Sequence, residues 1–483
     1  MTWKLTNLSA LILTILSLAG CYDFHPDKNA AIDLSRPIDA YTCVIESGKL
    51  SGKELAPAFG ARGYCYGEIG DYDRAIADYS RAIELDPTLD TPFFNRGLAY
   101  AHKDDHLRAV ADYTRAIGLA PANAEAYYNR GNSYMSKDDY DPAIADYSKV
   151  IALKPGSWAY NNRGGAYRLK GEFAKAVEDL SKAIELDPKL ALAYFNRGDA
   201  YRGLQRFEEA IGDYTKALEL SPSCAAFHNR GVCYDQRRMF TQAVADYTSA
   251  IELDPRVALA YYNRGNARRM TGDLKGAIAD YSAAIQRDPG FAPVYNNLGF
   301  CRCFLDDYDH ALADLSRAME LDPKSSNPYS IRGHVQRRKG DYDRAVADYS
   351  RAVELDPDDE YARIWLLLTL RRVPEALATG YREDFRTQVR TGNSLKFIRT
   401  VSTYLLGMDG LTEKGVLEEA RRGKNDQEVR DRLCEAYFYL GKERSLRGDR
   451  VGAEEFFGKT VETAVYDFDE YQEAKAELRD LQR

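Results

Sequence analysis

Apolar and small residues recur every three or four positions along two neighbouring stretches of residues 191–222. These positions are Tyr194, Gly198 and Tyr201 in the first stretch and Ala210, Tyr214 and Ala217 in the second. The spacing predicts two short amphipathic helices, with a break near Gln205 and a stop at Pro222. A hairpin of this size cannot bury its apolar faces alone, so it needs a copy of itself on each side.

The same pattern is present throughout residues 56–357. Every copy ends at a proline, and successive prolines are 33 or 34 residues apart. They are Pro87, Pro121, Pro155, Pro188, Pro222, Pro255, Pro289, Pro323 and Pro357. Every copy also has an aromatic residue, a glycine and a second-helix alanine at the places of Tyr194, Gly198 and Ala210. The sequence therefore predicts nine repeats that stack on one another.

This period, with its aromatic, Gly, Tyr, Ala, Tyr, Ala and Pro positions, resembles the tetratricopeptide repeat. The resemblance implies an all-α fold, an α-solenoid superhelix of helix-turn-helix repeats whose concave inner face binds ligands. Solenoid ends need capping helices. Residues 37–55 contain a short helix that resembles half a repeat, and we expect it to be the N-terminal cap.

Residues 1–20 resemble a bacterial lipoprotein signal peptide. Lys4 is followed by an apolar run that is too short to span a bilayer, and residues 18–21 (LAGC) are similar to a lipobox. The resemblance implies cleavage before Cys21, a lipid on its sulfur, and a tether over residues 21–36. An ordinary signal peptide with a chance cysteine is the alternative. Because Tyr22 is not the aspartate of an inner-membrane retention signal, we expect the outer membrane, facing the periplasm, rather than the inner membrane.

The 33- or 34-residue period ends at Pro357. We expect an irregular helical region over residues 358–430 and a degenerate repeat with a closing helix over residues 431–483. The helices expected here cover residues 360–370, 374–385, 395–406, 411–420 and 469–481, and the degenerate repeat covers residues 431–462. This order, with YFYLGKERSLRGDRVGAEEFF near its end, resembles NlpI-type outer-membrane lipoproteins. The resemblance implies an adaptor for peptidoglycan hydrolases and a periplasmic protease. The chain departs from those proteins in having many more regular repeats, which leaves its partners open.

Composition and motifs favour binding over catalysis. The net charge of −8 argues against general nucleic-acid binding. The six histidines are scattered, and no metal, nucleophile or phosphate-binding motif is present, so we expect no catalytic residue, metal or cofactor. An active site would have to lie in residues 357–430, which show no acid–base pair. Among the eight cysteines, Cys43 and Cys65 are a disulfide candidate.

An arginine precedes the repeat glycine in eight of the nine repeats, and an aspartate precedes the second-helix aromatic or leucine in all nine. Two interpretations follow. The arginines form a row of positive charges that binds a ligand, or each arginine forms an ion pair with the aspartate and stabilises its own hairpin. We favour the second, because the two residue types recur together. It predicts that Arg197 pairs with Asp213 and Arg130 with Asp146. The eighth repeat has Leu298 instead, so Asp314 should face water or pair elsewhere.

Counted from Ala191 as position 1, positions 5, 9 and 12 of the first helix form one stripe. By resemblance to the family, this stripe lines the concave face. The candidate partner-binding residues are Phe94, Tyr128, Arg168, Phe195, Arg202, Tyr262, Arg269 and Arg337. Aromatic residues and arginines commonly anchor interfaces, and arginines attract extended acidic segments. A solvated face with incidental aromatics is the alternative.

The sequence thus leads us to expect a non-enzymatic, lipid-anchored periplasmic scaffold that holds other envelope proteins in its groove. Peptidoglycan hydrolases or proteases are candidate partners. The alternative is a structural subunit of an outer-membrane assembly or of a pilus or secretion machine. The expected contacts are protein partners with extended or acidic segments and a membrane, through the lipid anchor. No nucleic acid is expected, and a homo-oligomer is compatible with the sequence.

Overall fold

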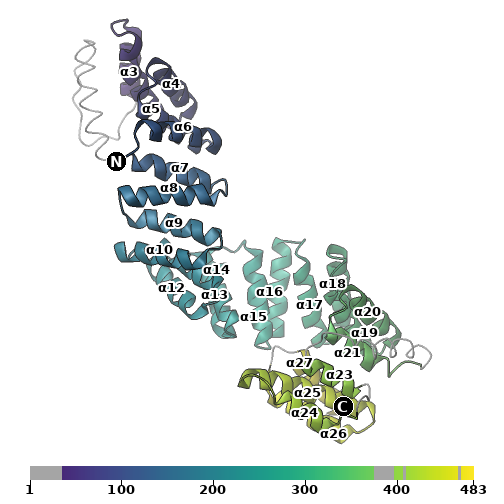
Figure 1. Ribbon diagram of the computed structural model, residues 1–483. Helices are drawn as coiled ribbons and strands as arrows, with labels where there is room; N and C mark the ends of the chain where they lie inside the picture. Colours follow the sequence, from purple (N-terminus) through teal and green to yellow (C-terminus); the bar gives the residue numbers. More distant parts are fainter. Residues whose placement is uncertain (1–34, 375–395, 406–409, 466–468, 483) are drawn as a thin grey trace. The chain divides into compact units, whose positions relative to one another are not determined.

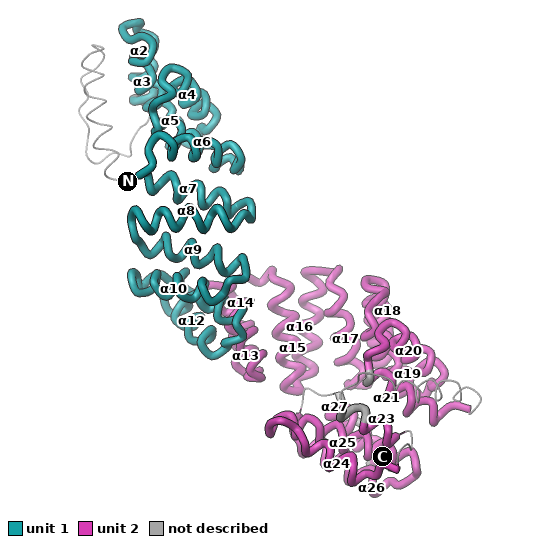
Figure 2. Tube along the Cα trace, in the orientation of Figure 1, with its two compact units in different colours: residues 1–222 teal, residues 223–483 magenta. Residues whose placement is uncertain are grey.

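The computed structural model describes residues 35–374, 396–405, 410–465 and 469–482. Within these ranges every regular element is a helix, so the expected all-α array of helix-turn-helix repeats is confirmed (Figure 1). The chain divides into two compact units, residues 1–222 and 223–483 (Figure 2). The expected signal peptide, Cys21 and residues 21–34 of the expected tether lie outside the described residues, whereas Ser35 and Arg36 begin helix α2.

The first unit contains the N-terminal helices and five repeats. Its elements are α2 (Ser35–Glu46), the 3-10 helix η1 (Gly52–Leu55), α3 (Ala56–Glu68), α4 (Tyr72–Leu85), α5 (Asp90–His102), α6 (His106–Leu119), α7 (Ala124–Met135), α8 (Tyr140–Leu153), α9 (Ser157–Leu169), α10 (Phe173–Leu186), α11 (Ala191–Gly203) and α12 (Phe207–Leu220). Helix α2 packs against α3, where the N-terminal cap was expected.

The second unit contains four repeats and the C-terminal helices. Its elements are α13 (Cys224–Gln236), α14 (Phe240–Leu253), α15 (Ala258–Met270), α16 (Leu274–Arg287), α17 (Ala292–Phe304), α18 (Tyr308–Leu321), α19 (Asn327–Arg338), α20 (Tyr342–Leu355), α21 (Glu360–Thr369), α23 (Lys396–Leu405), α24 (Glu413–Ala420), α25 (Asp426–Leu446), α26 (Arg450–Glu462) and α27 (Asp469–Gln482).

The repeat glycine allows the two helices of each hairpin to approach closely. A methyl group built on Gly198 would lie 2.9 Å from the ring of Tyr214, which is fully buried. The same substitution on Gly97 would lie 2.8 Å from Tyr113. Because real Cβ atoms do not approach this closely, only glycine fits opposite the second-helix tyrosine.

The turn between the two helices of each repeat always contains one residue with a left-handed backbone conformation. This residue is at position 15, and its φ is positive in Gly70, Asp104, Asp138, Gly171, Gln205, Arg238, Gly272, Asp306 and Gly340. Glycine adopts this conformation without steric cost, whereas a larger side chain is disfavoured there. The repeats with Gln205 and Arg238 therefore have strained turns.

The candidate disulfide between Cys43 and Cys65 is not formed, because Cys65 is a free thiol. Cys65 lies in a buried cluster with Tyr41 of α2. Residues two apart on a helix point about 200° apart, so Cys43 lies on the other side of α2 and is exposed. Burial raises the pKa of the Cys65 thiol to about 11, which makes it unreactive near neutral pH.

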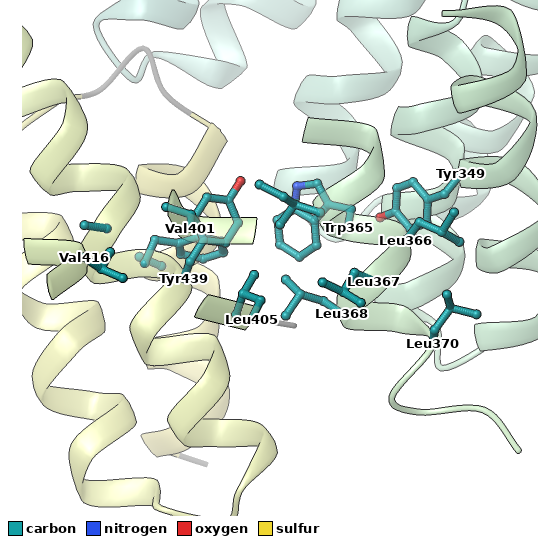
Figure 3. Close-up of a cluster of buried hydrophobic side chains, with 14 of the residues drawn as sticks. Tyr349, Trp365, Leu366, Leu367, Leu368, Leu370, Val401, Leu405, Val416 and Tyr439 are labelled. Atoms are coloured by element: carbon teal, nitrogen blue, oxygen red, sulfur yellow. The ribbon is translucent and has the colours of Figure 1, made fainter. Parts of the chain in front are cut away.

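The C-terminal helices close over the last repeat through a large apolar core (Figure 3). Trp365 of α21 lies at its centre, between Tyr349 of the last repeat and Tyr439 of α25. The core also contains Leu405 of α23 and Val416 of α24. The helix expected over residues 374–385 falls almost entirely outside the described residues. Helix α25 begins at Asp426, five residues before the start expected for the degenerate repeat.

Helices α25 and α26 form a hairpin of repeat geometry that has the repeat glycines but not the arginine–aspartate pair. A methyl group on Gly441 would lie 2.7 Å from the ring of Phe457, which corresponds to the glycine–tyrosine approach of the regular repeats. Gly448 has the positive φ of position 15. The positions that hold arginine and aspartate in other repeats hold Leu440 and Phe456, and both are buried.

Candidate protein-binding face

The repeated arginines are paired inside their own hairpins, as expected. Arg130 donates to both carboxylate oxygens of Asp146, at 2.8 and 2.7 Å. Arg197 does the same with Asp213, at 2.7 and 2.8 Å. The remaining pairs are Arg62–Asp78, Arg96–Asp112, Arg163–Asp179, Arg230–Asp246, Arg264–Asp280 and Arg332–Asp348. These arginines therefore do not form a row of cations for a ligand.

The same arginines also join neighbouring repeats, which the sequence analysis did not anticipate. Nη1 of Arg130 donates to the hydroxyl of Thr114 in the preceding repeat, at 2.9 Å. That hydroxyl in turn donates to the carbonyl of Val110, one helical turn earlier. The equivalent contacts are Arg62–Thr42, Arg96–Ser80, Arg163–Ser148, Arg197–Ser181 and Arg264–Thr248. These six guanidinium groups thus fix one hairpin internally and connect it to the repeat before it or, for Arg62, to α2.

The repeat without this arginine behaves as predicted. Asp314, which faces Leu298 in sequence register, pairs instead with Arg302 one helical turn further along α17. Burial outweighs this single contact and raises the pKa of Asp314 to about 6. Arg302 therefore replaces the missing arginine in part, but the carboxylate of Asp314 is paired less completely than in the other repeats.

The aromatic residues at position 5 contribute to the hairpin core as well as to the face. The rings of Tyr128 and Phe195 lie 6.0 and 5.9 Å from the buried tyrosines of their own second helices. Tyr262 has the same contact at 6.1 Å, and Phe94 is buried. Tyr128, Phe195 and Tyr262 are half-buried, so one ring edge is covered and the other remains accessible.

In the first unit, side-chain amides connect the first helices of three consecutive repeats. Tyr147 donates to Asn132 at 2.7 Å, and Asn162 donates to Asn132 at 3.3 Å and to Tyr128 at 3.0 Å. Asn161 donates to Asn162 at 3.1 Å, and Asn196 of the next repeat donates to Asn161 at 3.1 Å. We call these residues the amide row. It continues the stripe on which positions 5 and 9 were expected.

Arginines flank the amide row at its C-terminal end. Arg168 contacts Asp199 at 3.1 Å, and Tyr214 donates to the same carboxylate at 2.6 Å. Arg202 lies 3.8 Å from Asp199 with 41% of its side chain exposed. Two arginines therefore contact one buried aspartate at this end of the face.

The sequence analysis missed two apolar residues on the same face. Trp158 and Leu192 occupy position 2 in consecutive repeats, and they are 54% and 45% exposed. Position 2 lies one turn before position 5, so these side chains extend the stripe toward the helix N-termini. Including position 2 in the stripe during the sequence analysis would have identified both residues.

The second unit repeats the central part of this arrangement. Tyr281 donates to Asn266 at 2.8 Å, and Asn297 donates to Asn266 at 2.9 Å and to Tyr262 at 3.4 Å. Arg269 lies over the ring of Phe300, at 5.1 Å from its centre.

Arg337, unlike the other candidates, is engaged by the C-terminal helices. It donates to the buried Glu473 of α27 at 2.6 Å, and 11% of its side chain is exposed. The structure therefore places Arg337 under α27 rather than on an accessible part of the stripe.

The described residues show no group of acidic, histidine or cysteine side chains that could hold a metal ion. Within the same ranges, none of the helices combines the length and the apolar character that crossing a bilayer requires. A cavity of about 90 Å³ between α3 and α5 is lined by stripe residues that include Tyr64, Asn95 and Leu98. The face thus offers hydrogen-bonding, apolar and cationic groups to a ligand.

Comparison with known families agrees with the repeat pattern. Signatures described as "TPR repeat" match residues 63–104 and 164–205. Signatures described as "Tetratricopeptide repeat" match residues 92–123, 124–157, 191–224, 234–290, 292–325 and 327–359. Together these matches cover more than half of the chain. No match was found among curated protein sequences.

Solved structures of repeat proteins also match parts of the chain. YrrB, "a TPR protein with an unusual peptide-binding site", is 26% identical over 38% of this chain and 95% of its own, with a TM-score of 0.34. MamA is 30% identical over 34% of this chain and 91% of its own, with a TM-score of 0.33. A tetratricopeptide repeat protein from Parabacteroides merdae is 20% identical over 51% of this chain and 98% of its own, with a TM-score of 0.38.

Proposed function

Because the chain is a tetratricopeptide repeat protein, we propose that it is a non-enzymatic scaffold that binds a protein partner on its first-helix face. The observation that carries this proposal is the amide row with Trp158 and Leu192 beside it and Arg202 at its end. An extended peptide has one backbone donor and one acceptor per residue, which the half-buried side chains of Tyr128, Asn132 and Asn162 can satisfy. Exposed aromatic and aliphatic side chains bury the apolar residues of such a partner.

The charge on this face favours a partner segment with acidic residues. Arg168 and Arg202 share the single carboxylate of Asp199. The side chain of Arg202 is 41% exposed, so a partner carboxylate can reach it. Because Arg202 is partly exposed, we expect it to act mainly on the association rate and on the salt dependence of binding.

The proposed place of action is the periplasmic face of the outer membrane. The lipobox-like residues 18–21 support an anchor on Cys21, and the C-terminal resemblance to NlpI-type lipoproteins supports envelope partners such as peptidoglycan hydrolases or proteases. Replacement of Cys21 by Ser should then block lipid labelling and release the protein from the membrane fraction. A fixed subunit of an outer-membrane assembly or secretion machine is the second candidate. It would be isolated as a stable complex, whereas partners of an adaptor exchange.

The binding proposal is tested in two steps. Crosslinking in intact cells, followed by mass spectrometry of the captured proteins, first identifies a partner. The affinity of that partner is then measured for the variant Trp158→Ala/Arg202→Glu. We expect about a tenfold or greater loss, because the variant removes an apolar anchor and reverses a charge.

A matched control places the same types of change on second helices. Leu107 is 71% exposed at the start of α6, and Arg81 lies on α4 with 55% of its side chain exposed. The variant Leu107→Ala/Arg81→Glu should bind the partner as the wild type does. Equal affinities of both variants and the wild type would place the binding site elsewhere.

A further inference from the structure

The second unit contains a side-chain network that matches the central part of the amide row position by position. Its members, which we call the second amide network, are Tyr262, Asn266, Tyr281, Asn296 and Asn297. They lie four repeats after the corresponding residues of the first unit, which are Tyr128, Asn132, Tyr147, Asn161 and Asn162. The same repeat positions therefore form the same kind of network once in each unit.

The hydrogen bonds of the two networks are equivalent. The asparagine at position 9, Asn132 or Asn266, accepts from the buried tyrosine of its own second helix at 2.7 or 2.8 Å. It also accepts from the amide of the next repeat's asparagine, Asn162 or Asn297, at 3.3 or 2.9 Å. That amide donates in addition to the tyrosine at position 5, at 3.0 or 3.4 Å. Both oxygen lone pairs of the asparagine at position 9 are thus occupied.

Each network keeps the same hydrogen-bonding groups available to a ligand. Within the described residues, the amide N–H groups of Asn132 and Asn266 have no acceptor, because only the side-chain oxygens of these residues are engaged. The hydroxyls of Tyr128 and Tyr262 accept one hydrogen bond and can still donate one. All four side chains are half-buried, so a ligand can reach them. Each network thus presents amide and hydroxyl donors that its internal hydrogen bonds hold in place.

The available donors suit the carbonyl groups of an extended peptide backbone. Such a backbone has one carbonyl acceptor per residue, whatever its side chains are. Because the two networks offer the same donors, we expect both to bind the same type of segment. A segment that is recognised through its backbone can therefore occupy either unit.

The combination of residues that forms these networks is not a general feature of the repeats. Asparagine at position 6 is present in seven of the nine repeats. Tyrosine at position 5 together with asparagine at position 9 occurs only in repeats three and seven. The other repeats stack on one another without this combination, so stacking does not require it. Its recurrence in both units therefore supports a role in binding.

The surroundings of the two networks differ, and those of the first offer more contacts. Trp158 and Arg202 flank the amide row, whereas Leu259, which is 45% exposed, is the apolar residue at position 2 of repeat seven. Asn196 extends the amide row, but Ile331 has the equivalent position in the second unit. We therefore expect the second amide network to bind the same segment more weakly.

We propose that the second amide network is a second site for an extended peptide segment of the kind that the amide row binds. This inference rests on the proposed function of the first-helix face. Two sites on one chain fit a partner that presents the recognised segment twice, as a homodimer or as a tandem repeat. After one segment has bound, the other binds at a raised effective concentration, so a weaker second site still strengthens the complex.

The test uses the full chain and peptides from a random peptide display library. The library is selected on the variant Trp158→Ala/Arg202→Glu, so that the recovered peptides do not depend on these two side chains. A recovered peptide is then titrated into the wild-type chain by isothermal titration calorimetry. We expect two peptides to bind per chain.

Single substitutions at position 9 separate the two sites. Asn132→Asp or Asn266→Asp keeps the accepting oxygen and replaces the available amide by a carboxylate oxygen, which repels backbone carbonyls. Aspartate fits this position, since Asp199 has it in repeat five and accepts from Tyr214 at 2.6 Å. Each single variant should bind one peptide per chain. The double variant should bind the peptide at least about tenfold more weakly at both sites.

The variant Asn123→Asp/Asn425→Asp is the matched control. It introduces the same two charges at the N-caps of α7 and α25, where aspartate is as good a capping residue as asparagine. It should bind two peptides per chain, as the wild type does.

Two results would overturn the proposal. In the first, the wild type binds one peptide per chain, which Asn132→Asp abolishes and Asn266→Asp leaves unchanged; the proposed function then remains intact. In the second, the selection recovers no peptide, or neither substitution changes the number of peptides bound. The affinity of the crosslinked partner for Trp158→Ala/Arg202→Glu then tests the proposed function separately.

Discussion

The regular repeats and the C-terminal helices use charged residues in opposite ways. Eight of the nine repeats have the same partly exposed arginine–aspartate pair, with 13–29% of the arginine side chain accessible. The C-terminal helices instead meet the last repeat through one buried group of charges. Its members are His334, Arg337, Lys442, Glu473 and Glu477. They lie around Trp365, next to the apolar core that contains this residue. The first arrangement is local and repeated, and the second joins distant parts of the chain.

The hairpin of α25 and α26 shows what the repeated pair is for. This hairpin has Leu440 and Phe456 at the pair's positions and still has repeat geometry. The pair is therefore not needed to form a hairpin. The contacts of Arg130 with both Asp146 and Thr114 indicate that its role is to fix the stacking of one repeat on the next. The hairpin of α25 and α26 follows the irregular helices α23 and α24 instead of a regular repeat, and it has apolar residues at these positions.

The largest effect is expected from the buried group of charges. The change Glu473→Gln removes a fully buried carboxylate and leaves the guanidinium of Arg337 with only the more distant carboxylate of Glu477, at 3.7 Å. We expect a loss of about 3–5 kcal/mol in unfolding free energy, the usual cost of breaking a buried ion pair. Unfolding is followed by the fluorescence of Trp365 in a Trp158→Phe background. Glu462→Gln, at an exposed site on α26, is the matched control and should change little.

The second effect tests whether the repeated pair is replaceable. Arg130→Leu leaves Asp146, which is 5% exposed, without its main partner. We expect a loss of about 3 kcal/mol. The double change Arg130→Leu/Asp146→Leu leaves no buried charge and resembles the apolar solution of α25 and α26, so its cost should be smaller. A double-mutant cycle by urea unfolding gives the coupling. A double variant less stable than either single variant would contradict the comparison.

The third effect is the pH dependence of the buried group. Burial beside Arg337 and Lys442 lowers the pKa of His334 to about 3. Because the unfolded histidine titrates near 6.5, the unfolded state binds more protons between these values. This stabilisation is complete above about pH 6.5 and is lost as pH falls, by about 1.4 kcal/mol per pH unit while the folded histidine stays neutral.

The variant His334→Phe separates this histidine from other groups. Burial raises the pKa of Asp235 to about 6 and of Glu435 to about 7, and such raised carboxyl pKa values stabilise the fold as pH falls. The difference in unfolding free energy between wild type and variant cancels these terms. That difference should shift by about 2 kcal/mol against the wild type from pH 7 to pH 5. A difference that does not change with pH would show that His334 is already protonated or is accessible when folded.

The sequence predicted the repeats well because their information is local. Hydrophobic spacing, the glycine opposite a tyrosine and the terminal proline are each readable within 34 residues, and nine copies agree. The pairing of Arg130 with Asp146 followed from their joint recurrence. The contact with Thr114 was not predicted, because it depends on how one hairpin lies on the next.

The candidate site was less predictable. Arg337 has the same repeat position as Arg202, and only the three-dimensional structure shows that α27 covers it. The ion pair between Arg337 and Glu473 joins residues 136 positions apart and has no sequence pattern. Trp158 and the asparagines of the amide row were visible in the sequence, but their exposure and their contacts between repeats depend on tertiary packing.

The smallest predicted effect concerns the turn that all the repeats and the C-terminal hairpin share. Gln205 has a φ of 58°, where Gly448 of the C-terminal hairpin and four repeats have glycine. A left-handed conformation costs a non-glycine residue about 1–2 kcal/mol, and the greater freedom of glycine in the unfolded state offsets part of this. Gln205→Gly should therefore raise the unfolding free energy by about 0.5–1 kcal/mol in urea titrations. The change Gly448→Gln should lower it by a similar amount, since it moves the same strain into the C-terminal hairpin. If Gln205→Gly were destabilising instead, the positive φ of Gln205 would not be a source of strain in its repeat.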